Sequence, residues 1–261
     1  MDKTQVLDAL KQLKSNSPKR NFKQRVDLII PLKGLDMKKT DNQINSFTTL
    51  HYTSGKKTKV CALVGPELLS QAKEICDEAI SIDDLPKYDK NAIKKLAETY
   101  DFFIAQATVM PKVAATFGRI FGPKGKMPNP KAGCVVPPNA NLKSLYDKLQ
   151  KTIKIQTKNQ PLIQCAVGSE DMKEEEIADN VLLIHESVSH ILPNGKHNIR
   201  KVLLKLTMGY PVKIGAKAKE AKEEKKAEKS KEKKEKPKVK QKEETKAKKK
   251  KEGVKKPRAK K

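Results

Sequence analysis

Apolar residues recur either at helical spacing or at every second position along most of the chain. Helical spacing predicts helices over residues 4–13, 67–79, 90–100, 109–117, 141–151 and 174–192. Strand-like runs occupy residues 21–30, 47–52, 59–64, 80–82, 102–105, 153–157, 162–167 and 200–208. Beyond residue 215 neither pattern continues.

The middle of the chain alternates strands with helices of ~10–15 residues, which favours a parallel or mostly parallel sheet with helices on both faces. Residues 58–151 are therefore predicted to form a Rossmann-like, three-layer α/β domain. A hinge composition, Ser54-Gly55-Lys56-Lys57, marks the start of this segment.

The two flanking segments have a different pattern. Residues 21–30 and 47–52 are expected to form an antiparallel hairpin with a long loop, and residues 153–157 and 162–167 a hairpin around Asn159-Gln160-Pro161. In residues 200–208, Val202, Leu204, Leu206 and Met208 should share one face. Neither flank alone has enough strands for a convincing sheet. We therefore expect a discontinuous α+β outer domain, residues 1–57 and 152–215, into which the α/β domain is inserted.

The last 46 residues, 216–261, are rich in Lys and Glu and have no apolar periodicity. Such a segment cannot bury enough apolar surface to offset the entropy lost on ordering, so it is predicted to be a disordered basic tail. Its charge suits RNA, although a solubilising extension would have the same composition.

The net charge of +26 on 261 residues favours a polyanionic partner, nucleic acid or an anionic membrane surface. With no Trp and 4% aromatic residues, stacking on a broad aromatic platform is not expected to dominate binding. The sequence has no apolar run of the ~20 residues that a membrane span needs and no secretory signal, which predicts a cytoplasmic protein without a membrane partner. The four cysteines lack a C-x-x-C pair and are expected to be buried, reduced thiols.

One stretch, residues 118–133, reads G-R-I-F-G-P-K-G-K-M-P-N-P-K-A-G. Its glycines and prolines predict a shaped loop rather than a helix or strand. It is not a nucleotide-binding P-loop, because Gly125-Lys126 is followed by Met127 instead of Ser or Thr. The histidines show no metal-ligand spacing and no Ser lies in a nucleophile-elbow context. We predict no catalytic residue, metal or cofactor, and so no enzyme.

The same stretch resembles the signature of the ribosomal protein L1 family. Two further matches are R-N-F-K-Q-R-V-D at residues 20–27 and T-M-G at residues 207–209, and the resemblance runs from about residue 4 to about residue 214. The resemblance implies a discontinuous first domain and an inserted α/β domain joined by two hinge strands. The short start and the basic tail are closer to the archaeal and eukaryotic members.

The resemblance also implies an RNA-binding surface. Its members here would be Phe22, Lys23, Gln24, Arg25, Thr207, Met208 and Gly209. Strand alternation puts Lys201 and Lys205 on the same face as Thr207, where they are expected to reach phosphate or ribose. The family usually has acidic or small hydroxyl residues just after the Phe, where this chain has Lys23, Gln24 and Arg25. Composition alone would place Phe22 in the core and read 207–209 as a strand end. The cations of the predicted loop at residues 118–133 are expected either to contact RNA or to shape the domain interface. They are Arg119, Lys124, Lys126 and Lys131.

The implied function is that of a structural constituent of the large ribosomal subunit. Such a protein binds large-subunit rRNA at the mobile stalk, assists release of deacylated tRNA from the exit site, and represses its own mRNA. It would be a cytoplasmic protein and a monomer off the ribosome. One rival is a general basic RNA-binding or chaperone protein driven by the tail. A second is a nucleotide-dependent enzyme, against which the missing phosphate motifs argue.

Overall fold

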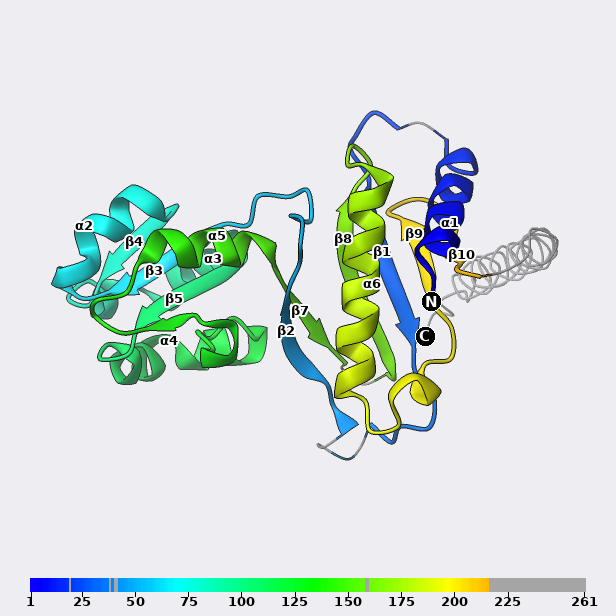
Figure 1. Ribbon diagram of the computed structural model, residues 1–261. Coiled ribbons are helices and arrows are strands. Elements are labelled where there is room, and N and C mark those ends of the chain that lie inside the picture. Colours follow the sequence, from blue (N-terminus) through cyan, green and yellow to red (C-terminus); the bar gives the residue numbers. More distant parts are fainter. Residues whose placement is uncertain (19, 38, 40–41, 158–159, 216–261) are drawn as a thin grey trace, which may run out of the picture. The chain divides into compact units, whose positions relative to one another are not determined.

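A computed structural model describes residues 1–18, 20–37, 39, 42–157 and 160–215 (Figure 1). Residues 1–214 form one compact unit. The predicted tail, residues 216–261, and Asn159 of the predicted hairpin turn lie outside the described residues.

The flanking segments build one antiparallel sheet with the strand order β10-β9-β1-β8. Its elements are β1 Arg25–Pro31, β8 Leu162–Ser169, β9 Leu203–Leu206 and β10 Val212–Lys213. Two helices, α1 Lys3–Ser15 and α6 Glu174–Ile191, pack with this sheet (Figure 1). Because side chains alternate along a strand, Val26, Leu28 and Ile30 of β1 all enter the core beneath these helices, as predicted.

Both predicted hairpins are wrong. β1 pairs with β8 and β9, whereas β2 Asn45–Thr49 pairs with β7 Thr152–Gln156, in a register that sets Phe47 opposite Lys154. A two-residue turn fixes strand pairing locally, but neither the long connection after β1 nor the five-residue connection after β7 is such a turn. Strand β1 instead lies between β9 and β8, where its alternating apolar side chains are buried on one face of the sheet. The β2–β7 ribbon carries the chain into and out of the inserted segment (Figure 1).

The inserted segment forms a parallel sheet with the order β4-β3-β5-β6, as predicted. Its strands are β3 Val60–Val64, β4 Glu78–Ser81, β5 Phe102–Gln106 and β6 Val135–Val136. Val60, Ala62 and Val64 pack with α2 Pro66–Ile75 and α5 Leu142–Lys151. The opposite face, with Cys61 and Leu63, packs with α3 Lys90–Thr99 and α4 Met110–Lys124. Two separate cores on the two faces of one sheet confirm the three-layer α/β architecture.

Helix α4 overturns the prediction that residues 118–133 are loop throughout. The helix continues through Gly118, Gly122 and Pro123 and ends at Gly125, whose φ of +64° is left-handed. Phe117 and Phe121, four residues apart, are both fully buried and extend the apolar stripe, which outweighs the poor helix propensity of glycine and proline. Pro123 lies in the last turn. Only the part after Lys124 remains irregular, with one 3-10 turn at Pro130–Ala132.

Two smaller expectations also fail. Helix α1 begins at Lys3, with Asp2 rather than Thr4 at its N-cap position. Ile191, expected on the buried stripe of the long helix, is 41% exposed because it lies in the last turn, beyond the core. Ile177, Val181, Ile184 and Val188 are buried as predicted.

Candidate nucleic-acid interface

The segment after β9 is fixed to the start of β1 by backbone and side-chain hydrogen bonds. The Arg25 N–H donates to Thr207 Oγ1 over 3.1 Å, and the Thr207 N–H donates to the Arg25 carbonyl over 3.1 Å. The turn then closes with the Gly209 N–H donating to the Leu206 carbonyl at 2.9 Å. Two segments 182 positions apart in sequence are thereby held side by side.

Gln24 is the second anchor of this turn. Its side chain is only 1% exposed, and its Oε1 accepts a hydrogen bond from the Met208 N–H at 3.3 Å. The Gln24 carbonyl accepts from the Glu170 N–H at 2.9 Å. The sequence placed Gln24 among direct RNA contacts, but the structure shows a buried side chain that orients the turn.

Large apolar side chains stand out from these two segments. Phe22 is 52% exposed, Met208 60% and Tyr210 49%, and they are three of the five exposed large hydrophobic residues in the described part of the chain. Met208 was expected to continue the strand face of Val202, Leu204 and Leu206, but β9 ends at Leu206, and Met208 lies in the turn that follows and is exposed. Exposed apolar side chains grouped among polar ones are typical of an interaction site.

Sequence reasoning missed Tyr210 as a candidate. The signal was available, because an aromatic residue directly after T-M-G is conspicuous in a chain with 4% aromatic residues. The structure also shows why glycine suits position 209. A Cβ there would lie 2.9 Å from Ser17 Oγ and 3.2 Å from the Leu206 Cβ, so the turn fits closely against the end of α1.

Cationic side chains accompany the exposed apolar ones. Lys23 is 80% exposed and forms an ion pair with Asp171 at 2.7 Å. Lys205 of β9 lies opposite Asp27 of β1, and Arg25 and Lys201 are half-buried. Burial raises the pKa of Asp27, and the nearby Arg25 and Lys205 oppose that shift only in part. The open side of the sheet beside the turn therefore presents several cations.

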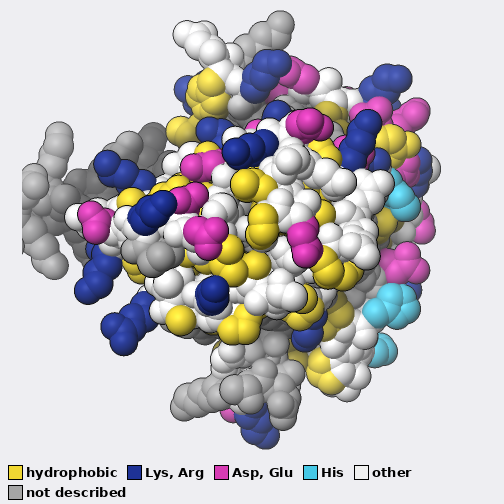
Figure 2. Space-filling view, turned by 90° about the vertical axis from the view of Figure 1, so that its left-hand side faces the viewer, with side chains coloured by type: hydrophobic (Ala, Val, Ile, Leu, Met, Phe, Trp, Pro, Cys, Tyr) yellow, Lys and Arg dark blue, Asp and Glu magenta, His cyan; other side chains and the backbone are white. Residues whose placement is uncertain are grey.

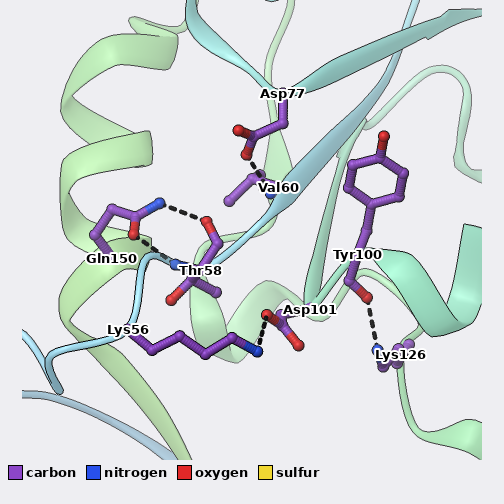
Figure 3. A network of polar contacts seen from close by, with 8 residues as sticks. All are labelled: Lys56, Thr58, Val60, Asp77, Tyr100, Asp101, Lys126 and Gln150. Atoms are coloured by element: carbon purple, nitrogen blue, oxygen red, sulfur yellow. Dashed lines mark hydrogen bonds and ion pairs between the residues drawn. The ribbon is translucent and has the colours of Figure 1, made fainter. Parts of the chain in front are cut away.

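The four cations of residues 118–133 do not form one group. Lys124 Nζ contacts Glu98 Oε1 at 2.9 Å and the Lys94 carbonyl at 3.3 Å, both on α3. Lys126 Nζ donates to the Tyr100 carbonyl at 2.6 Å, and burial lowers the pKa of this lysine (Figure 3). Lys124 joins the end of α4 to α3, and Lys126 binds the residue that follows α3, whereas Arg119 and Lys131 are exposed.

Further polar contacts hold the start of the inserted segment (Figure 3). Gln150 accepts from the Thr58 N–H at 2.8 Å and donates to the Thr58 carbonyl at 2.7 Å. Lys56 lies 3.8 Å from Asp101. On the face drawn in Figure 2, Lys and Arg side chains are interspersed with Asp and Glu. Beside the turn at residues 207–209 the cations are likewise accompanied by carboxylates, Asp27 and Asp171.

The described residues hold no group of three His, Cys, Asp or Glu side chains placed to bind a metal ion. All four cysteines are free, as predicted, and burial raises the pKa of Cys134 to about 11 and that of Cys165 to about 12. Across the part that the structure describes, no helix is both long and apolar enough to span a membrane.

Comparison with known proteins points to one family. The sequence profile described as "Ribosomal protein L1p/L10e family" matches residues 11–210. The large ribosomal subunit protein uL1 of Methanothermococcus thermolithotrophicus is 40% identical over 216 residues, which cover 82% of this chain and 99% of that protein. Its counterpart from Methanocaldococcus jannaschii is 37% identical over 226 residues, 86% of this chain and all of that protein. That of Hyperthermus butylicus is 37% identical over 211 residues, 80% of this chain and 95% of its own length. These relatives are archaeal, as the resemblance led us to expect, and the chain belongs to the ribosomal protein L1p/L10e family.

Proposed function

We propose that this chain is a structural protein of the large ribosomal subunit and binds large-subunit rRNA at the mobile stalk. The binding surface consists of Phe22, Lys23 and Arg25 at the start of β1, Lys201 and Lys205 of the β9 segment, and the turn at residues 207–210. The observation that carries the proposal is the pair of exposed side chains, Phe22 and Met208, on segments that hydrogen bonds fix to each other. Membership in a family of ribosomal proteins agrees with the prediction that the chain is not an enzyme.

Residues in this surface have two kinds of role. The side-chain oxygens of Gln24 and Thr207 accept hydrogen bonds from backbone N–H groups of the protein, and these bonds hold the turn in place. Phe22, Met208 and Tyr210 leave apolar area open, which suits contact with unstacked bases and ribose in folded RNA. Lysine and arginine beside them neutralise phosphates and supply the salt-dependent part of the affinity.

The proposal includes a division of labour along the chain. Residues 1–57 and 152–215 form the outer, RNA-binding domain, and residues 58–151 form the inserted domain. The separate cores on the two sides of the β2–β7 ribbon support this division. On the ribosome the protein assists release of deacylated tRNA from the exit site, and off the ribosome, as a cytoplasmic monomer, it represses its own mRNA. The proposal of these two activities rests on the resemblance of residues 20–27, 118–133 and 207–209 to the ribosomal protein L1 family.

The test compares Phe22→Ala with Ile191→Ala, which removes another exposed apolar side chain, 41% against 52% for Phe22, from the last turn of α6. Each full-length protein is titrated against a stalk rRNA fragment and a scrambled RNA of equal length at near-physiological salt. Loss of one stacking contact is worth about 1–3 kcal/mol, so Phe22→Ala should bind the stalk fragment at least about fivefold more weakly. Ile191→Ala should bind as the unchanged protein does. Equal affinity in both variants would remove Phe22 from the surface.

A second comparison separates this proposal from a basic protein driven by its tail. Residues 1–215, without the tail, should prefer the stalk fragment over scrambled RNA by roughly 10³, the low end of specific readout by analogy with DNA-binding proteins. If the shortened chain bound both RNAs equally, charge alone would explain binding and the rRNA site would be withdrawn. Repression is tested apart from this, by adding the protein to translation of its own mRNA with and without an excess of the stalk fragment.

A further inference from the structure

Helix α6 differs in charge from the rest of this chain. It carries five carboxylates, Glu174, Glu175, Glu176, Asp179 and Glu186, and no lysine or arginine, in a chain of net charge +26. Three acids in the first turn suit the helix dipole, which accounts for Glu174 to Glu176. Glu186 lies in the second half of the helix, where the dipole favours cations, so helix stability does not account for it.

A hollow of about 480 Å³ opens beside this part of α6. It is lined by His51, Tyr52, Asp179, Leu182, Leu183 and Glu186. Tyr52 is 42% exposed, and Leu182 and Leu183 are half-buried. The hollow therefore combines an apolar floor, an aromatic wall, the imidazole of His51 and two carboxylates.

The wall of the hollow is held firmly. Asn180, fully buried, accepts from the Tyr52 N–H at 3.2 Å and donates to the Tyr52 carbonyl at 3.2 Å. The same amide group also donates to the Val167 carbonyl at 3.0 Å, which ties the Tyr52 segment to both α6 and β8. Exposed Tyr52 thus stands on a fixed backbone beside the acidic helix. A preformed wall lowers the entropic cost of binding a partner.

The charges at the hollow differ in how far they are already paired. Asp179 Oδ1 lies 2.6 Å from Lys3 Nζ, which satisfies part of its charge. Glu186 is 76% exposed, and its ion-pair partner in the structure is His190, at 4.0 Å and in an i,i+4 relation. That contact is at the limit of an ion pair and exists only when the histidine is protonated. Glu186 remains able to meet an incoming cation.

We propose that this hollow binds a basic segment of another protein, in which a lysine or arginine meets Glu186 and a neighbouring aliphatic side chain rests on Leu182, Leu183 and Tyr52. The occupant is identified by charge complementarity. The carboxylates repel RNA phosphates, and a metal cation or other small ion would leave the apolar side chains of the hollow exposed. Lys3 offsets the charge of Asp179, which leaves Glu186 as the carboxylate for the incoming cation, and at physiological ionic strength positive charge farther away than the Debye length of about 8 Å is largely screened. The proposal goes beyond RNA binding and leaves the turn at residues 207–210 free.

The probe is a fluorescent 14-residue peptide of Lys and Leu at helical spacing, titrated with the full-length protein at 150 mM salt. A second peptide with uncharged Gln in place of Lys controls for apolar attraction alone. Glu186→Lys should weaken binding of the basic peptide by about tenfold or more, because an attractive charge becomes a repulsive one. The matched control is Glu74→Lys, which makes the same change on an exposed position of α2. This control should leave the affinity unchanged.

The contact is then located by hydrogen–deuterium exchange. The basic peptide should slow exchange in residues 51–52 and in α6, and leave the turn at residues 207–210 as it was. Glu186→Lys must remain folded by circular dichroism, which its exposure makes secure, and Tyr52→Ala provides a second variant without a charge change. Equal weakening by Glu186→Lys and Glu74→Lys, equal binding of the two peptides, or protection at the turn instead of α6 would each overturn the proposal.

Discussion

Replacement of Gln24 by leucine tests whether a buried side chain controls the RNA-binding turn. Leucine has nearly the same volume but cannot accept the hydrogen bond from the Met208 N–H. An unsatisfied buried donor costs about 1–3 kcal/mol, and the 3.3 Å length of this bond places the expected loss near the lower end. A loss of about 1 kcal/mol lowers the melting temperature by roughly 2–4 °C for a unit of this size.

The RNA-binding effect should exceed what this loss of stability explains. With its anchor removed, the turn no longer holds Met208 and Tyr210 in place beside Phe22. Loss of about 1.4 kcal/mol of contact energy corresponds to a tenfold weaker complex with the stalk fragment. Thermal unfolding and a filter-binding titration on the same protein samples give the two quantities.

Thr157→Val provides the matched control. Thr157 is 6% exposed, and its Oγ1 accepts a hydrogen bond from the Ile44 N–H at 2.9 Å, far along the chain from the turn. This variant also loses a buried oxygen acceptor and keeps the side-chain volume. It should lose similar stability and keep its RNA affinity. If the two variants bound RNA alike, the positioning role of Gln24 would be refuted.

Three further predictions concern single side chains. Lys23→Ala should weaken binding to specific and scrambled RNA alike and reduce the slope of log affinity against log salt by about 1, read from titrations at several salt concentrations. Asp27→Asn should gain stability relative to the unchanged protein between pH 3 and pH 7 in urea unfolding. Burial raises the pKa of Asp27, so the folded protein binds the proton of this carboxyl more tightly than the unfolded protein does, and it loses stability as pH rises through that range. Asparagine does not titrate, so the variant lacks this loss. A difference in stability between the two proteins that stayed constant with pH would contradict the prediction. Phe121→Ala should cost about 3–5 kcal/mol in the free energy of unfolding, since the ring is fully buried with its centroid 4.3 Å from that of Phe103; a loss under 1 kcal/mol would contradict the packing of α4.

The inserted segment was predictable because its signals are local. Each strand of the parallel sheet is a short apolar run between amphipathic helices, and a parallel sheet covered on both faces needs little more than that pattern. The pairing of β1 with β9 was not predictable in the same way. Nothing near Val26 in sequence identifies Leu206 as its neighbour, and the long loop after β1 allowed a wrong partner, β2.

The course of α4 shows a second limit of sequence reasoning. Glycine and proline at 118, 122 and 123 argue for a loop when propensities are counted residue by residue. Tertiary packing decided otherwise, because Phe121 meets both Phe103 and Phe117 only if the helix continues. Lys124 then reaches Glu98 of α3, so this exposed cation already has an anionic partner within the protein.

The candidate RNA surface shows why residue type alone does not assign a role. Gln24 is two positions from Phe22, and Thr207 is next to Met208. The side chains of Gln24 and Thr207 form hydrogen bonds within the protein, whereas those of Phe22 and Met208 are exposed to solvent. Loss of a holding residue should lower both stability and affinity, whereas loss of Phe22 or Met208 should lower affinity alone. Measuring both quantities on each variant therefore distinguishes the two roles, which a binding assay by itself would merge.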